Sequence, residues 1–400
     1  MTVESPKSPK SLPFAPLVEP AAELTRDELV RYARHLTLEH IGHEGQRRLK
    51  NARVLVTGAG GLGSPALHYL AAAGVGTIGI VDDDVVDVSN LQRQVVHGVS
   101  DIGRAKVESA ADAVARINPL VTVEQHHTRL TADNAVNIVG AYDLVMDGAD
   151  NFATRYVVSD ACTLTDTPCV WGSILRFDGR LSVFANGPGH DGISYRDLHP
   201  DAPAPGEVPS CAAGGVVGAL PGTIGSLMVT EAIKLITGTG SPLFGRLLIH
   251  DGMAMTFREL TILPDPDAPL VTAVNDGVGD ACAVATGAGA YPTVSPEELQ
   301  SRLDTGAVLV DVREPWEREI VSIPGALAVP LAELQDRGAE ALPDATRGRD
   351  VVFHCKAGSR SEQALDAVAS YFGTREENAA HLAGGVLAWV HNLHPDLPTY

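Results

Sequence analysis

The chain has 400 residues, which exceeds the usual size of a single hydrophobic core and favours two domains. Its apolar fraction of 44% and charged fraction of 20% are ordinary for a soluble globular protein. The formal net charge of −20 argues against a nucleic-acid partner, because binding to phosphates requires a basic surface. A small protein or a soluble metabolite is a better-matched partner.

Residues 1–20 are rich in Pro and Ser and lack the apolar core of a signal peptide, so we expect a flexible N-terminal tail. No apolar run reaches the length of a membrane span, which argues against a membrane protein. The cysteines are odd in number and scattered, a poor disulfide framework that favours a reducing cytoplasm. They are Cys162, Cys169, Cys211, Cys282 and Cys355.

A first α/β domain is expected over residues 21–262. Thr25 and Glu28 form a potential capping box that opens a helix running through RYARHL. From residue 53 onward, short apolar strands alternate with amphipathic helices, which predicts a parallel sheet covered on both faces. The expected strands are 54–58, 77–82, 121–125, 143–148, 179–185 and 246–252, and the expected helices are 64–74, 104–117, one from about 131, and 222–236.

Two segments without periodicity interrupt these patterns. Residues 186–221 are rich in Gly and Pro and contain Cys211, so they form a long loop that is either disordered or functional. Residues 263–290 have a similar composition and indicate an interdomain linker. A second α/β domain is expected over 291–400, with helices at 295–303 and 359–372 and strands at 307–312 and 351–355.

A glycine loop, Gly58-Ala-Gly-Gly-Leu-Gly63, follows an apolar strand and opens a helix. Such a loop lets the backbone approach phosphate, and the helix N-terminus offers free N–H groups. Asp82 ends the next strand, where a carboxylate binds a ribose hydroxyl. These features indicate an adenine nucleotide. A tight turn without a ligand is the simpler alternative, and a dinucleotide-dependent oxidoreductase would carry the same features.

Cations downstream of the loop favour ATP over a nicotinamide cofactor. Arg93 and Lys106 follow Asp82, and cations relieve the repulsion when a carboxylate attacks a triphosphate. Taken singly, both residues are more often solvated surface charges. Arg93 belongs to the segment Ser89, Asn90, Leu91, Gln92, Arg93 and Gln94.

These motifs, in this order, resemble the ThiF/MoeB family of ubiquitin-activating-like adenylyltransferases. The resemblance rests on RYARH, GAGGLGS, DDDVVDVSNLQRQ, GRAKVESA, RINP, DGADN and IGSLMVTEAIKLITG, and covers residues 25–262. It implies a Rossmann-like domain that uses ATP and Mg²⁺. The implied substrate is the C-terminal Gly-Gly carboxylate of a ubiquitin-like sulfur carrier of the MoaD, ThiS or CysO type. Molybdenum cofactor, thiamin and cysteine biosynthesis and tRNA thiolation all remain open as pathways.

The resemblance also implies roles for individual residues. Gly61 would lie against the nucleotide, Asp82 on its ribose, and residues 89–93 with Lys106 on its phosphates. Asp150, next to Asn151, would hold magnesium, which commonly uses one or two carboxylates plus substrate phosphates.

Two of these roles have structural alternatives. Asp150 is also placed to be the N-cap of the following helix. Arg34 matches the arginine that reaches the triphosphate in the neighbouring subunit of family members, which implies a homodimer. Its alternative is an exposed helical arginine.

The sequence departs from the family at a structural zinc site. Bacterial relatives carry two Cys-x-x-Cys pairs, whereas this chain has Ser194-Tyr-Arg-Asp197 at the first and no cysteine at the second, LPDPDAPL. A tetrahedral site of that type requires four thiolates. We therefore predict that the chain holds no zinc.

Cys355 ends a strand and begins a six-residue loop that leads into a helix. Loop N–H groups, the helix dipole and Arg360 would stabilise an anion and make Cys355 nucleophilic. The alternative is that Cys355 is a buried core residue without a catalytic role. A tyrosine phosphatase loop has five residues between Cys and Arg, whereas this one has four and resembles a rhodanese loop that carries a persulfide. LVDVREPWE and IPGALAVPL also resemble rhodanese signatures, with Asp311 and Arg313 as fold-supporting residues. The loop consists of Cys355, Lys356, Ala357, Gly358, Ser359 and Arg360.

The implied reaction has two steps: adenylation of the carrier, then attack of a Cys355 persulfide and reductive release of a thiocarboxylate. A cysteine desulfurase or thiosulfate would recharge Cys355. In relatives a cysteine at the position of Cys211 lies in a mobile loop over the adenylate; here it either forms a covalent intermediate or is a spectator. Rival functions are an oxidoreductase with a regulatory rhodanese module and a non-catalytic carrier-binding scaffold.

Overall fold

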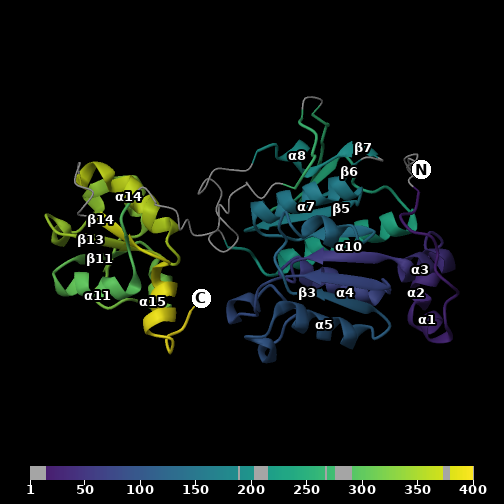
Figure 1. Cartoon of the computed structure of the whole chain (residues 1–400), viewed down its shortest axis with the longest axis horizontal. Coiled ribbons are helices and arrows are strands. Elements are labelled where there is room, and N and C mark those ends of the chain that lie inside the picture. Colours follow the sequence, from purple (N-terminus) through teal and green to yellow (C-terminus); the bar gives the residue numbers. More distant parts are fainter. Residues whose placement is uncertain are drawn as a thin grey trace, which may run out of the picture. The chain divides into compact units, whose positions relative to one another are not determined.

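The computed structural model describes residues 15–187, 190–201, 215–265, 268–274, 291–372 and 379–399. The chain divides into two compact units, Met1–Gly279 and Asp280–Tyr400 (Figure 1). Each unit has its own sheet and its own hydrophobic core.

The first unit contains the expected parallel sheet, which confirms the α/β fold. Its parallel strands stand in the order β3-β2-β1-β4-β5. This order reverses between β1 and β4, and ligands of open α/β sheets bind outside the carboxyl ends of the strands at such a switch point. The strands are β1 (Arg53–Thr57), β2 (Thr77–Val81), β3 (Thr122–His126), β4 (Leu144–Asp147) and β5 (Cys169–Leu175).

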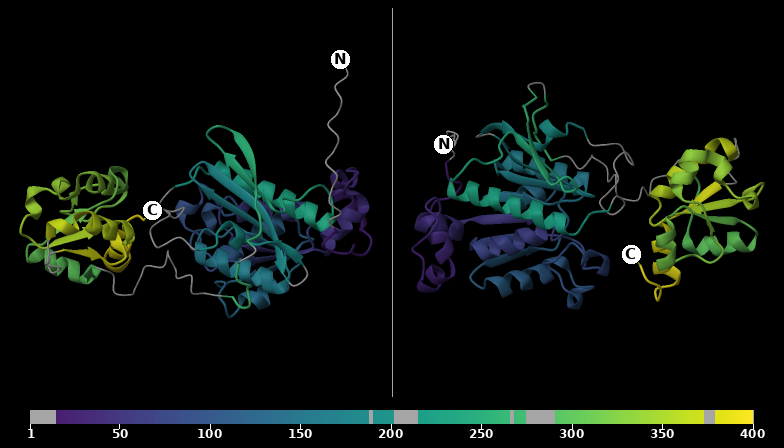
Figure 2. Two further views of the ribbon diagram at one scale, coloured as in Figure 1. Left: turned by 90° about the horizontal axis from the view of Figure 1, so that it is seen from above. Right: turned by 180° about the vertical axis from the view of Figure 1, so that it is seen from behind.

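Antiparallel strands extend this sheet beyond β5, in the order β6-β8-β9, and β7 pairs with β6 (Figure 2). All six residues of β9 are exposed. The strands are β6 (Asp178–Gly187), β7 (His190–Ile193), β8 (Arg246–Asp251) and β9 (Thr256–Thr261).

Helices cover both faces of the sheet, and the inner parallel strands β1, β2 and β4 are largely buried, whereas the edge strand β3 is not. Val54 and Val56 of β1 belong to one core, with α3, α4, α5 and α10, while Leu55 belongs to the other, with α6 and α7. The first set is α3 (Gly42–Asn51), α4 (Gly63–Ala73), α5 (Lys106–Ile117) and α10 (Ala219–Thr237). The second is α6 (Ala135–Val139), α7 (Phe152–Thr165) and α8 (Tyr195–Leu198).

Helix α10 qualifies as a membrane span by length and composition alone, contrary to the expectation that no apolar run does. Its apolar residues instead lie in the protein core, where Ile224, Met228 and Leu235 are buried against α4 and the sheet. The apolar character of α10 therefore follows from its place between other elements of the unit.

The N-terminal helix is divided where a single helix was expected. The capping box of Thr25 and Glu28 is confirmed, but α1 (Arg26–Arg31) ends at Tyr32 and α2 (Ala33–Leu36) follows. Tyr32 is 5% exposed, its ring lies where a Cβ on Gly74 would clash, and its hydroxyl accepts a hydrogen bond from Asn118. Packing of this ring thus overrides continuous helical geometry.

Three expected segment descriptions require correction. The N-terminal tail does not extend to residue 20, because Leu17 N–H donates to Leu235 and Val18 is buried in the core. The linker does not begin at residue 263, because Asp265 bonds Asp197 and Val274 packs against the first unit. The loop 186–221 is not free of regular structure, since β7, α8 and the start of α10 lie within it. The apolar side chains of these segments account for the difference.

The second unit is a five-stranded parallel sheet in the order β10-β14-β13-β11-β12. Helices α11 and α15 pack on one face, and α13 and α14 on the other. The strands are β10 (Thr293–Val294), β11 (Val308–Asp311), β12 (Leu327–Ala328), β13 (Val351–His354) and β14 (Ala379–Leu382). The helices are α11 (Pro296–Asp304), α12 (Pro315–Ile320), α13 (Leu331–Arg337), α14 (Ser359–Phe372) and α15 (Gly385–Leu393).

Candidate functional site

The glycine loop connects β1 to α4 at the switch point of the first sheet. Gly58 has φ +86°, and a Cβ on Gly63 would lie 1.9 Å from the Gly58 carbonyl oxygen, so both positions require glycine. A Cβ on Gly61 would stand 3.3 Å from Pro221 of α10. The loop therefore brings bare backbone to the N-terminus of α4, where free N–H groups attract phosphate.

Asp82 directly follows β2 and lies beside this loop. Its carboxylate accepts hydrogen bonds from the N–H of Ala59, at 2.8 Å, and from the N–H of Asp84, at 2.9 Å. Burial raises the pKa of Asp82, although nearby Lys106 and these hydrogen bonds oppose that effect. The predicted ribose-binding carboxylate is thus already oriented against the second residue of the glycine loop.

Lys106, the first residue of α5, is buried with 7% of its side chain exposed. Its ammonium group donates to Asp84 at 2.8 Å. Because Lys106 also acts electrostatically on Asp82, the structure brings this predicted cation to the end of β2, beside the loop. It is therefore not a solvated surface lysine.

The predicted phosphate-binding segment begins with a short 3-10 helix, Val88–Asn90, capped by Asp87. Arg93 Nη1 donates to the Ser89 carbonyl at 3.1 Å, which curls the guanidinium back over the segment. A Cβ on Gly218 would lie 2.1 Å from the Gln92 carbonyl oxygen, so the segment packs against the start of α10. Leu91 is the C-cap of the short helix.

Asp150 and Asn151 follow β4, on the other side of the switch point. Asn151 caps α7 by accepting a hydrogen bond from the Thr154 N–H at 2.8 Å. The alternative that Asp150 is the helix cap is therefore wrong. Within the described residues no hydrogen bond or ion pair uses the Asp150 carboxylate, which is exposed.

Asp147, which the sequence did not single out, supports this turn from below. It is 2% exposed, accepts from Thr57 Oγ1 at 2.8 Å and from the Ala149 N–H at 2.9 Å, and burial raises its pKa. The one sequence feature that could have pointed to Asp147 is its place as a carboxylate at the end of a buried strand, three residues before Asp150. Arg34 lies exposed on α2, as its structural alternative required.

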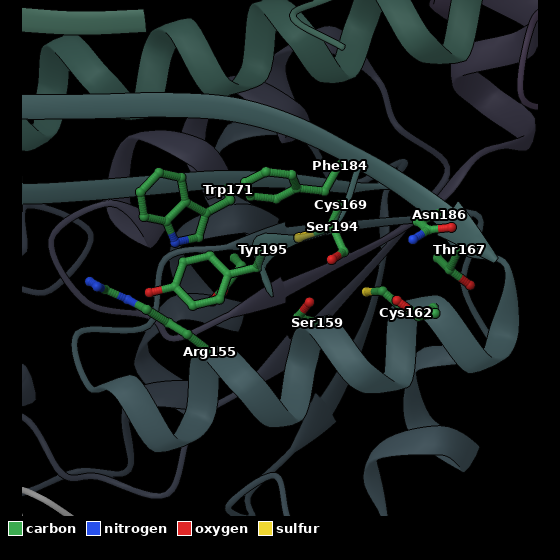
Figure 3. A pocket seen from close by; sticks show the side chains of 12 residues that line it. Arg155, Ser159, Cys162, Thr167, Cys169, Trp171, Phe184, Asn186, Ser194 and Tyr195 are labelled. Carbon is green, nitrogen blue, oxygen red and sulfur yellow. The ribbon is translucent and has the colours of Figure 1, made fainter. Parts of the chain in front are cut away.

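A cavity with room for about one water molecule lies between α7, β5, β6 and α8 (Figure 3). The Tyr195 hydroxyl points toward the Arg155 guanidinium. Among the described residues, the buried Trp171 Nε1 has no hydrogen-bond partner. Cys162 and Cys169 line the cavity and are buried free thiols, as expected of core residues. The hydrogen bond with Cys162, together with burial, raises the pKa of Cys169 well above its ordinary value, so this thiol is unreactive.

Hydrogen bonds occupy the position at which relatives were expected to hold zinc. Ser194 and Asp197 form a capping box around α8, and Asp197 also accepts from the Asp265 N–H at 3.0 Å. Arg196 makes a two-bond ion pair with Asp160, at 2.7 and 2.9 Å. The bond between Asp197 and Asp265 joins the two segments in which relatives have the zinc-binding cysteines and this chain has none. Cys211 and Cys282 lie outside the described residues.

In the second unit, Cys355 follows β13 and is 1% exposed. Its Sγ accepts a hydrogen bond from the Gly358 N–H at 3.0 Å and lies 3.7 Å from Ser361 Oγ. Gly358 has φ +118°, which favours glycine there. The loop thus provides donors to the sulfur, and α14 begins at Ser359 with its N-terminus at the loop.

Arg360 was expected to stabilise an anion in the loop, but its guanidinium forms an ion pair with Glu317 instead. Its two terminal nitrogens bond the two carboxylate oxygens of Glu317, each at 2.7 Å. Glu317, on α12, is 3% exposed. The two-bond geometry is the strong form of an Arg–carboxylate pair, so Arg360 connects the loop that begins at Cys355 to α12.

Asp311 and Arg313 form a fully buried ion pair beneath this loop. Arg313 donates to both Asp311 oxygens, at 2.9 and 2.7 Å, and to the Val321 carbonyl at 2.9 Å. His354 is also fully buried, with Nε2 3.5 Å from Asp311 Oδ2, and burial lowers its pKa to about 4. The geometry matches the fold-supporting role expected for Asp311 and Arg313.

Comparison with known proteins agrees with both units. The ThiF family matches residues 32–270, and the rhodanese-like domain matches residues 295–392. The chain is 51% identical to the probable adenylyltransferase/sulfurtransferase MoeZ of Mycobacterium tuberculosis, over 98% of this chain and 99% of that protein. It is 38% identical to the adenylyltransferase and sulfurtransferase MOCS3 of Aedes aegypti, over 94% of this chain and 90% of that protein.

Further similarities concern the first unit. The sulfur carrier protein adenylyltransferase of Thermus thermophilus is 50% identical over 62% of this chain and 92% of its own length. Among solved structures, PaaA matches with a TM-score of 0.53 at 21% identity, over 61% of this chain and 76% of its own. MccB of E. coli with ATP matches with a TM-score of 0.51 at 18% identity, over 60% of this chain and 73% of its own. At these identities the two structures support the fold alone.

Proposed function

Because the chain belongs to the ThiF family and carries a rhodanese-like domain, we propose that it adenylates a ubiquitin-like sulfur carrier and converts its C-terminal carboxylate into a thiocarboxylate. The chain is an adenylyltransferase and a sulfurtransferase. The observation that carries the proposal is that one chain has both features. Its first unit has a glycine loop at the switch point of the sheet, and its second unit has the buried Cys355 sulfur bonded by a loop N–H group. The oxidoreductase alternative receives no support from the relatives.

In the first step ATP lies over the glycine loop, with its ribose on Asp82 and its phosphates near Arg93 and Lys106. The carrier carboxylate attacks the α-phosphate, forming the acyl–O–P bond and releasing pyrophosphate. Lys106 supports this role because its ammonium is held by Asp84, which is itself 69% exposed, and acts electrostatically on Asp82. Fixed cations stabilise the charge that accumulates in the transition state.

We place magnesium on Asp150. The carboxylate follows β4 at the carboxyl edge of the sheet, is exposed, and is not used as the helix cap. A hard oxygen ligand of this kind suits Mg²⁺, which would neutralise phosphate charge during the attack. The buried hydrogen bonds of Asp147 hold the turn that presents Asp150.

In the second step the terminal sulfur of a Cys355 persulfide attacks the acyl carbonyl and AMP leaves, which gives an acyl disulfide. A thiol then attacks the Cys355 sulfur, releasing the carrier thiocarboxylate and leaving a mixed disulfide on Cys355. A second thiol reduces that disulfide. A sulfane-sulfur donor then transfers one sulfur atom to the free Cys355 thiolate. A persulfide on a cysteine desulfurase would leave as its cysteine thiolate, and thiosulfate would leave as sulfite.

Further parts of the proposal rest on the family resemblance. Arg34 reaches the triphosphate of a second subunit, and its exposure on α2 is compatible with that role, so we propose a homodimer. We propose a cytoplasmic location because reducing conditions keep Cys355 free for sulfur transfer. Cys211 is proposed to lie in a loop over the adenylate, where it either forms a covalent intermediate or is a spectator.

Mass spectrometry tests the proposal directly. The purified chain, ATP, Mg²⁺, thiosulfate and a thiol reductant are mixed with each of several Gly-Gly carriers, and we expect one carrier to gain a sulfur in place of an oxygen. Cys355→Ser should abolish this gain while leaving carrier-dependent pyrophosphate exchange intact, whereas the matched control Cys162→Ala should leave both activities intact. A sulfur gain undiminished in Cys355→Ser would contradict the second step.

The same assay determines the role of Cys211. Cys211→Ala with a normal rate of thiocarboxylate formation would eliminate a covalent intermediate at that residue. Loss of thiocarboxylate with normal pyrophosphate exchange would place Cys211 between the two steps.

A further inference from the structure

His97 joins the glycine loop to the helix that carries Lys106. Its ring is 6% exposed, with Nε2 2.9 Å from the Ala59 carbonyl oxygen and Nδ1 2.8 Å from Ser109 Oγ. A carbonyl only accepts hydrogen bonds, so Nε2 carries the hydrogen in the neutral ring, and Nδ1 contacts the Ser109 hydroxyl. Burial lowers the pKa of His97, which favours this neutral form.

Ala59 is therefore held on both sides of its backbone. Its N–H donates to Asp82 at 2.8 Å, and its carbonyl accepts from His97. Its neighbours Gly58 and Gly60 have no side chains to anchor the loop, and glycine loses more conformational freedom on ordering than any other residue. The shape of the loop thus depends on the few hydrogen bonds that reach its backbone.

The other end of the connection is equally buried. Ser109 is 1% exposed and lies one helical turn after Lys106 in α5. The chain of contacts from Ala59 through His97 to Ser109 links the glycine loop with the helix that positions the phosphate-binding cation. Asp82, directly after β2, bonds the same loop, and Lys106 of α5 acts electrostatically on Asp82.

We propose that His97 is a positioning residue for ATP. By holding the Ala59 carbonyl, it keeps the glycine loop in the conformation that presents backbone N–H groups to the phosphates, a preorganisation that raises affinity for the nucleotide. This inference rests on the proposed adenylation function.

Two amide substitutions separate this role from simple packing. The His97→Gln amide can place an N–H where Nε2 stands and keep the bond to Ala59. The His97→Asn amide is one carbon shorter, so it reaches toward Ser109 but not Ala59. Both variants lose the imidazole ring, and their difference isolates the hydrogen bond to the loop.

The full-length variants are compared by calorimetric titration with ATP in the presence of Mg²⁺. We expect His97→Asn to raise the Kd for ATP about tenfold, the effect of one lost hydrogen bond, and His97→Gln to stay within about threefold of wild type. In pyrophosphate exchange with a Gly-Gly carrier, the KM for ATP should rise in His97→Asn while kcat changes less. The thermal midpoints of the two variants should be similar.

Equal Kd values for the two amide variants would overturn the inference. If His97→Asn does not fold, Ser109→Ala takes its place: the ring loses its orienting partner, so the Kd for ATP should rise, and an unchanged Kd overturns the role of His97. A wild-type chain that binds no ATP overturns the proposed function and this inference with it, so the two failures are distinguishable.

Discussion

The Lys106 ammonium lies 2.8 Å from Asp84, yet only 7% of the lysine side chain is exposed, against 69% of the aspartate. The cation is therefore fixed in the wall of the site, while its partner faces solvent and is easily solvated on its own. An arriving triphosphate can replace Asp84 as the partner of Lys106, because water solvates the exposed aspartate once the pair separates.

Removal of this cation should impair adenylation without unfolding the chain. We expect Lys106→Met to lower kcat/KM for carrier-dependent pyrophosphate exchange by at least ~100-fold, because it removes a fixed charge that stabilises the transition state. The thermal midpoint should change little, since Asp84 is exposed. Asp84→Asn is the matched control and should cost less than ~10-fold. Exchange at the wild-type rate in Lys106→Met would refute the role of this residue.

The pair of Glu317 and Arg360 should be a determinant of stability in the second unit. Glu317→Ala removes the buried carboxylate that holds the guanidinium, and we expect a loss of about 2–3 kcal/mol in the free energy of unfolding, discounted for the partial exposure of Arg360. Calorimetric unfolding of the full chain measures this as a lower midpoint for the second unit. Arg337→Ala, which breaks an exposed pair with Glu333, should cost less than ~1 kcal/mol. Equal effects of the two variants would contradict the assignment.

His354 should make the second unit sensitive to acid. Its folded pKa of about 4 lies below the ordinary 6.5, so the unfolded state binds the proton first as the pH falls. Above pH ~6.5 the ring is neutral in both the folded and the unfolded state, so it does not oppose folding. Between pH ~6.5 and ~4 the free energy of unfolding should fall by up to roughly 3 kcal/mol, because only the unfolded state binds the proton.

Unfolding of wild type and His354→Gln at a series of pH values measures this effect. The difference between the two proteins should change across that interval and level off above it. A constant difference from pH ~7 to ~4 would show that His354 does not carry the acid sensitivity.

The Ser194–Asp197 turn should hold its two segments together without metal. We expect elemental analysis of the purified chain to find far less than one zinc per chain, because four thiolates at the required spacing are lacking. Asp197→Ala should lower the free energy of unfolding by about 1–3 kcal/mol, since it removes the acceptor for the Ser194 and Asp265 N–H groups. Asp178→Ala, at the start of β6, is the control for loss of a charge. One tightly held zinc per chain would overturn the expectation.

Local patterns accounted for most of the fold. The alternation of buried strands and amphipathic helices predicted the parallel sheet, and the capping box of Thr25 placed the start of α1 correctly. The break at Tyr32 was missed because a ring packed on Gly74, from another helix end, decides it. Among the described strands, β5, β7, β9, β10, β12 and β14 were missed. Strands β7, β10, β12 and β14 have only two to four residues, which carry too little periodicity to be detected.

Features that depend on neighbouring residues could be predicted from residue type and spacing: the glycine loop from Gly58 to Gly63, the carboxylate after β2, and the loop from Cys355 to Arg360. The side chains that meet across long separations could not be predicted in this way and are known from the folded chain. Glu317 pairs with Arg360, His97 with the Ala59 carbonyl, and Asp197 with Asp265.

The physical reason lies in burial. A buried charge or polar ring is stabilised by a partner, because burial without one costs free energy. The amino-acid sequence does not say which of many candidates is near, since strand order and helix packing bring the partner from elsewhere in the chain. Residue type and spacing therefore specify the chemistry of this protein, and the packing of its two sheets specifies how each chemical group is held.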